Sequence, residues 1–78
     1  MLKIKDSVDL KELEKFGFEE DGILDGKVTG LTNGHVDIEL YDSINDKWNT
    51  RKIYVLGSAY LDTIYDLIKA DLVEKVEG

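Results

Sequence analysis

The fold is decided by residues 31–56, which read LTNGHVDIELYDSINDKWNTRKIYVL. The Asn33-Gly34 dipeptide in this stretch favours a two-residue hairpin loop, which pairs Leu31 with Val36. Because side chains alternate along a strand, the apolar residues of this hairpin share one face. They are Leu31, Val36, Ile38 and Leu40. The opposite face carries His35, Asp37, Glu39 and Tyr41.

A third strand is predicted near residues 48–56. A four-residue loop pairs Ser43 with Trp48, and the same register produces three matched cross-strand pairs. These pairs are Val36–Val55, Ile38–Ile53 and Glu39–Lys52. The one mismatch sets Leu40 opposite Arg51. We expect Arg51 to lie near the margin of the sheet with its stem over Leu40.

Two amphipathic helices are predicted, one before and one after these strands. Asp9 and Glu12 form a capping box and Gly17 is a left-handed C-cap, so the first helix covers residues 9–16. The second helix begins at Ser58 as N-cap and buries an apolar stripe at helical spacing. The stripe consists of Leu61, Ile64, Tyr65 and Ile68, widened by Leu67.

Short strands are predicted at both ends, at residues 2–4 and 72–76, and we expect them to pair. Residues 19–34 contain evenly spaced glycines. We interpret these as turns, including the hairpin dipeptide Asp25-Gly26, because the spacing of a phosphate-binding loop is absent. The predicted fold class is α+β, with a small antiparallel sheet of three central strands, possible terminal strands and two amphipathic helices on one face. Residues 1–78 are expected to form a single domain.

The composition excludes several classes of function. The chain has 78 residues, a net charge of −7 and no cysteine. A disulfide scaffold, a thiolate zinc site and a cysteine nucleophile are therefore excluded. The acidic balance argues against binding to duplex DNA. The net charge lies in residues 19–46, which we interpret as a solubilising face; the alternative is a negative patch for a basic partner.

The sequence contains no convincing catalytic or metal-binding constellation. His35, Asp37 and Glu39 alternate on one strand, but neighbours on a solvated strand face do not form a closed metal site. Neither Ser43 nor Ser58 lies in a nucleophile motif. We therefore predict no metal, no cofactor and no enzymatic activity.

The strongest candidate site is a set of aromatic and charged side chains on the strand face opposite Ile38 and Ile53. Tryptophan and tyrosine are the residues that most often anchor protein interfaces. The interface candidates are Tyr41, Trp48, Tyr54, Asp37, Glu39 and Lys52. We expect this set to bind a partner protein or a second copy of the chain. Complete burial of Trp48 in the core would contradict this hypothesis.

The two ends of the chain carry a family resemblance. Residues 2–18 read LKIKDSVDLKELEKFGF and residues 61–77 read LDTIYDLIKADLVEKVE. These stretches, about half of the chain, resemble the two ends of small uncharacterised proteins encoded by phages and prophages of Gram-positive bacteria. The resemblance implies a phage-type cytoplasmic protein of a bacterial host, and it transfers no functional residues.

The function favoured by these observations is a non-enzymatic protein-interaction module, such as an adaptor or an acidic inhibitor of a basic host or phage protein. Two alternatives stay open: a winged-helix-like nucleic-acid-binding domain and a structural homodimer. Nucleic acid is disfavoured because Asp62, Asp66 and Asp71 outnumber Lys69 along the second helix and its end. Without a signal-peptide pattern or a long apolar run, we expect a cytoplasmic protein that does not enter a membrane.

Overall fold

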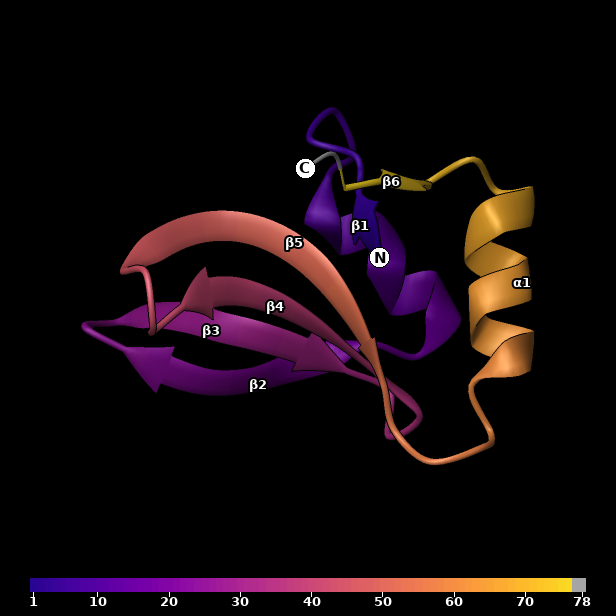
Figure 1. Cartoon of the computed structure of the whole chain (residues 1–78). Helices are drawn as coiled ribbons and strands as arrows, with labels where there is room; N and C mark the ends of the chain where they lie inside the picture. The colour runs from indigo at the N-terminus through magenta and orange to yellow at the C-terminus, as the bar shows by residue number, and fades with distance from the viewer. Residues whose placement is uncertain (77–78) are drawn as a thin grey trace.

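The computed structural model describes residues 1–76 and shows a six-stranded antiparallel sheet with two short helices (Figure 1). The strands are β1 (Leu2–Ile4), β2 (Glu19–Leu24), β3 (Lys27–Thr32), β4 (Val36–Asp42), β5 (Lys47–Val55) and β6 (Val73–Lys75). The helices are the 3-10 helix η1 (Leu10–Phe16) and the α-helix α1 (Leu61–Lys69). The strand order is β2-β3-β4-β5-β1-β6, so β2 to β5 form a meander and the terminal strands complete one edge.

The predicted fold class is wrong, because the sheet has six strands and residues 1–76 contain a single α-helix. The first predicted helix, residues 9–16, is a 3-10 helix. Both predicted end residues are confirmed, since Asp9 is the N-cap and Gly17 has a φ of 82°. The predicted capping box differs, because the Asp9 carboxylate accepts the backbone N–H of Lys11 at 3.0 Å and not that of Glu12. The segment buries one residue, Leu13. So short a helix gains little from propagation, which favours the tighter 3-10 geometry.

The strand β2 was absent from the prediction, although its turn was recognised. Asp25 and Gly26 have φ values of 53° and 77°, the positive values that a type I′ turn requires. The turn sets Leu24 opposite Lys27. All six residues of β2 are exposed. Its sequence therefore lacks the alternation of polar and apolar residues by which half-buried strands are recognised.

The hairpin between β3 and β4 is shifted from the predicted register. Leu31 lies opposite Ile38 and not opposite Val36. The reason is the Asn33 side chain, whose Oδ1 accepts the backbone N–H groups of His35 and Val36 at 3.0 and 2.9 Å and moves the loop along the chain. Because the shift is two residues, each side chain keeps its predicted face.

The predicted register between β4 and β5 is confirmed for three pairs: Val36–Val55, Ile38–Ile53 and Glu39–Lys52. Beyond Leu40 the register changes, and Trp48 lies opposite Tyr41 rather than opposite Ser43. The cause is a bulge in β5, where Asn49 has a φ of 61°. A bulge of this kind places additional residues on one strand and bends it.

Arg51 lies in this bulge and is buried, which corrects its predicted position at the sheet margin. It has a φ of 60° and is 8% exposed. Its Nη1 donates hydrogen bonds to the carbonyl oxygens of Lys5 and Val8, both at 2.8 Å. Its Nε donates to Oδ1 of Asn49 at 2.7 Å. The guanidinium therefore connects the bulge to the segment between β1 and η1.

The helix α1 turns only part of its predicted apolar stripe to the core, because Leu67 is completely buried and Ile64 packs against the core residues. It begins after Tyr60 rather than at Ser58. Its buried residues are Thr63 and Leu67. The other three members of the predicted stripe are exposed, at 65% for Leu61, 63% for Tyr65 and 54% for Ile68. Asn33 Nδ2 donates a hydrogen bond to Thr63 Oγ1 at 2.8 Å, which fixes this orientation of the helix.

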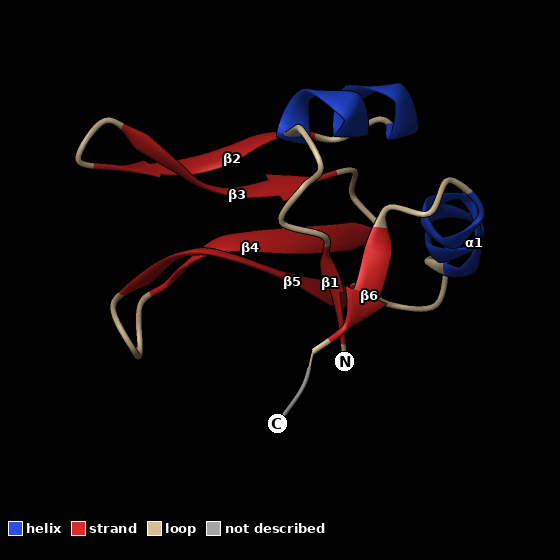
Figure 2. Cartoon of the chain, turned by 90° about the horizontal axis from the view of Figure 1, so that it is seen from above, coloured by secondary structure: helices blue, strands red, loops and turns tan. Residues whose placement is uncertain are grey.

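The predicted pairing of the two terminal strands is confirmed. β1 pairs antiparallel with β6 and sets Lys3 opposite Glu74. The other side of β1 pairs with β5, where Lys3 lies opposite Lys52. Beyond β6, the backbone N–H of Val76 donates to the carbonyl of Met1 at 3.0 Å. β1 therefore joins the end of the chain to the central meander, as the view from above shows (Figure 2).

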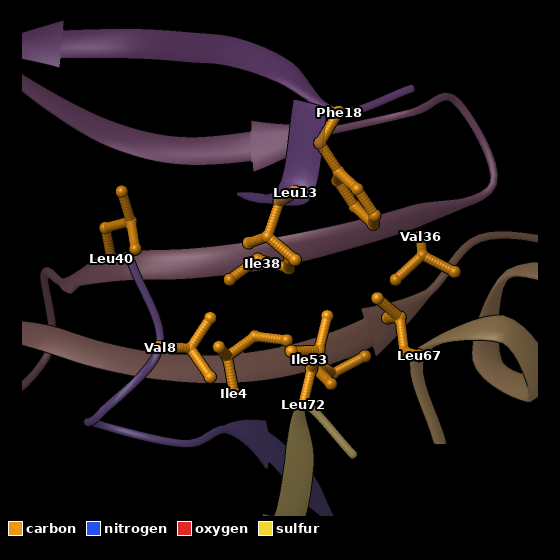
Figure 3. Packing of buried hydrophobic residues seen from close by; sticks show 10 residues of the cluster. All are labelled: Ile4, Val8, Leu13, Phe18, Val36, Ile38, Leu40, Ile53, Leu67 and Leu72. Atoms are coloured by element: carbon orange, nitrogen blue, oxygen red, sulfur yellow. The ribbon is translucent and has the colours of Figure 1, made fainter. Parts of the chain in front are cut away.

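The hydrophobic core lies on one face of the sheet and includes residues from both helices (Figure 3). Its buried members are Ile4, Val8, Leu13, Phe18, Val36, Ile38, Leu40, Ile53, Leu67 and Leu72. Leu13 from η1 and Leu67 from α1 are completely buried in it. Within residues 1–76, no helix has the length and apolar character needed to cross a membrane.

Candidate functional site

The six interface candidates lie on the face of the sheet that points away from the core. We call this set the aromatic face: Tyr41, Trp48, Tyr54, Asp37, Glu39 and Lys52. Three cross-strand pairs bring them together, namely Asp37–Tyr54, Glu39–Lys52 and Tyr41–Trp48. The bulge in β5 does not separate them, because the residues on both sides of it keep the same face. Trp48 is 37% exposed, so it is not a core residue.

The centre of the aromatic face is a pair of packed, tilted rings. The centroids of Tyr41 and Trp48 lie 4.6 Å apart, with an angle of 36° between the ring planes. Lys27 Nζ lies 5.3 Å from the Trp48 centroid and makes a cation–π contact. The Tyr41 hydroxyl donates to Asp46 Oδ1 at 2.8 Å. These contacts hold both rings in a fixed orientation while leaving the Trp48 side chain partly accessible.

Glu39 organises the other half of the aromatic face. Its Oε1 accepts a hydrogen bond of 2.7 Å from the Thr50 hydroxyl, and its Oε2 accepts a longer one of 3.4 Å from Tyr54. Tyr54 is 39% exposed. Lys52 lies directly opposite Glu39, as predicted. The result is a fixed carboxylate between an exposed aromatic ring and a cation.

Two phenols of the aromatic face have perturbed acidities. The hydrogen bond to Asp46 raises the pKa of Tyr41 above its ordinary value of 10.0, and burial and the Asp46 charge add to this effect. Burial, followed by the nearby Glu39 carboxylate, raises the pKa of Tyr54. Both hydroxyls are therefore neutral at physiological pH and act as hydrogen-bond donors rather than as bases or nucleophiles.

The acidic side chains and the histidine near this face do not gather into a metal site. Across residues 1–76, no three His, Cys, Asp or Glu side chains gather closely enough to hold a metal ion. His35 is exposed at the hairpin loop, while Asp37 and Glu39 lie within β4. The face offers aromatic surface, the carboxylates of Asp37 and Glu39 and one lysine, and exposed tyrosine and tryptophan are the residues that most often anchor protein interfaces.

Sequence analysis missed three supporting residues of this site: Lys27, Asp46 and Thr50. Lys27 contacts Trp48 from the β2–β3 hairpin, and no pattern in the neighbouring sequence predicts a contact between two hairpins. Thr50 faces Glu39 because of the bulge, which depends on the left-handed backbone of Asn49 and was not predicted. Asp46 is the one that the sequence could most easily have indicated, because it lies in the loop between β4 and β5, which carry Tyr41 and Trp48.

Comparison with known proteins adds no assignment to this site. No family model, no curated protein and no solved structure matches the chain. The function therefore has to be inferred from the contacts, exposure and charges of the chain itself.

Proposed function

We propose that this chain is a non-enzymatic protein-interaction module that binds a partner protein through the aromatic face. The observation that carries this proposal is the packed Tyr41–Trp48 pair, which is held by Asp46 and Lys27 yet leaves Trp48 37% exposed. Aromatic side chains in fixed orientations bind at low cost in conformational entropy, because few rotamers are lost. Tyr54 extends the same surface.

The charge of the chain favours a basic partner. Asp37 and Glu39 stand among the aromatic side chains, and the net charge of −7 is concentrated in residues 19–46. Complementary charge raises the rate of association and disfavours wrong partners. The module would then act as an adaptor or as an acidic inhibitor. The resemblance of residues 2–18 and 61–77 to phage proteins favours a host or phage protein as the target.

The test is a pull-down with the tagged chain from a nuclease-treated lysate of a Gram-positive host. Trp48→Ala is compared with the wild type and with the control variant Tyr65→Ala, which removes an exposed ring from α1 on another surface. We expect a stoichiometric basic protein that is lost with Trp48→Ala, retained with Tyr65→Ala and released by salt. Circular dichroism establishes beforehand that both variants fold.

Two results would contradict the proposal. Retention of the partner by Trp48→Ala would exclude the aromatic face as the binding surface. Failure of the wild type to retain any specific protein would remove the support for an adaptor.

A structural homodimer is the second candidate, favoured by the exposed apolar side chains of Leu61, Tyr65 and Ile68 on α1. Light scattering on the wild type and on Tyr65→Ala distinguishes this case, because only the homodimer has twice the monomer mass.

A further inference from the structure

A groove of about 740 Å³ lies on the core side of the sheet, between η1 and the hairpin of β2 and β3. We call it the hairpin groove. Its apolar lining includes Leu10 from η1, Val28 and Leu31 from β3, and Leu40 from β4. Leu10, Val28 and Leu31 are half-buried, so part of their apolar surface is accessible within the groove. None of the six residues of the aromatic face lines it.

The hairpin groove exists because two hairpins diverge. The described pairing between β3 and β4 runs from Thr32–Asp37 to Gly30–Glu39 and then stops. Beyond that point the tip of the β2–β3 hairpin and the tip of the β4–β5 hairpin separate (Figure 2). Val28 therefore has no cross-strand partner on β4. The volume lies within the range of about 300–1,000 Å³ typical of binding pockets.

The rim of the groove is acidic. Glu14 of η1 and Glu19 and Glu20 of β2 line it, and all three are exposed. Lys11 is the one cation among the lining residues. The ion pairs found in residues 1–76 join other side chains, so none of them neutralises these three carboxylates. An apolar floor with an acidic rim selects a ligand that is apolar in its body and cationic at its edge.

We propose that the hairpin groove binds a cationic amphipathic peptide segment of a partner protein. An apolar side chain of the segment rests on Val28 and Leu31, and its lysine or arginine heads meet the carboxylates of Glu14 and Glu20. Glu20 lies opposite Leu31 and therefore shares the groove face of the sheet. Lysine and arginine suit this arrangement because their stems are apolar while their heads are charged. This inference goes beyond the proposed function, since it concerns a second surface on the other side of the sheet.

The experiment uses three short synthetic peptides and the full chain. The first is an amphipathic helix with leucine along one face and lysine along the other. The second carries glutamate in place of lysine, and the third carries serine in place of leucine. Fluorescence anisotropy measures affinity, and amide chemical shifts of the labelled protein locate the site. We expect only the first peptide to bind with shifts centred on η1 and on residues 28–31.

Matched charge variants separate a specific rim from general attraction to an acidic chain. Glu14→Gln/Glu20→Gln removes two carboxylates from the rim, and Asp62→Asn/Asp66→Asn removes two from α1. We expect about a three- to tenfold loss of affinity for the first variant and less than about twofold for the second, because exposed charge pairs contribute modestly and locally. Val28→Thr, which keeps the shape of the side chain, should also weaken binding.

Each result either supports the groove or overturns it. Equal losses in the two charge variants, equal binding of the glutamate peptide, shifts centred on Trp48 or no binding at all would each overturn the inference. Trp48→Ala should leave peptide affinity unchanged. The groove can therefore fail while the aromatic face stands, and the reverse also holds.

Discussion

Replacing Arg51 with methionine tests the contact on which the packing of the N-terminal segment depends. The guanidinium is 8% exposed and donates to the carbonyl oxygens of Lys5 and Val8 at 2.8 Å. Methionine keeps most of the apolar stem and removes the donors. The Val8 carbonyl then loses the guanidinium donor, the Lys5 carbonyl keeps only the backbone N–H of Val8 at 3.1 Å, and the bulge loses its connection to the segment that follows β1.

The expected loss can be estimated from these bonds. A hydrogen bond to a charged group contributes about 1.5–3 kcal/mol, and removal of the guanidinium also relieves the cost of burying its charge. We therefore expect Arg51→Met to lower the free energy of unfolding by about 2–4 kcal/mol. For a domain of this size, each kcal/mol corresponds to about 4–8 °C in Tm, so the melting temperature should fall by at least about 8 °C.

Urea unfolding monitored by circular dichroism measures this difference. Lys52→Met is the control, because it removes a cation from the next residue, whose side chain lies on the opposite face of β5. We expect the control to change stability by less than about 0.5 kcal/mol. Arg51→Lys keeps the charge but not the planar fork and should fall between the two. A loss for Arg51→Met no larger than that of the control would refute this account.

Two further predictions concern pH and the core. Hydrogen bonds from Asn45, and then from the backbone of Ile44, hold the pKa of Asp42 below its usual value of 3.8. This carboxylate therefore stabilises the fold above that pH, and its contribution is lost as the pH falls through the lowered pKa. The difference in urea midpoint between the wild type and Asp42→Asn should therefore be larger at neutral pH than at acidic pH. A difference that does not change with pH would contradict this prediction. In the core, Leu67→Ala should cost about 2–5 kcal/mol because Leu67 is 0% exposed, whereas Leu61→Ala, at 65% exposed, should cost less than about 0.5 kcal/mol in the same assay.

The parts of the fold that follow from local chemistry were predictable from the sequence. Asp9 and Gly17 mark both ends of η1, and the Asp25-Gly26 dipeptide marks a turn. The register that pairs Ile38 with Ile53 follows from matched apolar side chains. The aromatic face was predictable for the same reason, since alternation along β4 and β5 is enough to place its residues together.

The parts that depend on distant contacts were not predictable in this way. The orientation of α1 depends on a hydrogen bond between Thr63 and Asn33, which belong to different elements. Leu61 and Tyr65 were predicted to be buried because their spacing places them on an apolar side of the helix. The spacing does not show whether another element covers that side. The bulge depends on the buried side chain of Arg51, whose acceptors lie near the other end of the sequence.

The pairing of β1 with β6 also has a consequence for the order in which the chain folds. The strands β2 to β5 pair with their neighbours in sequence, so each hairpin closes a short loop. The contact between Lys5 and Leu72 closes a loop of almost the full chain, which carries a larger entropic cost. We therefore expect the meander to form first and the terminal pair last. Substitutions in β1 or β6 should then act mainly on the rate of unfolding, and those in the meander on the rate of folding, which stopped-flow kinetics would measure.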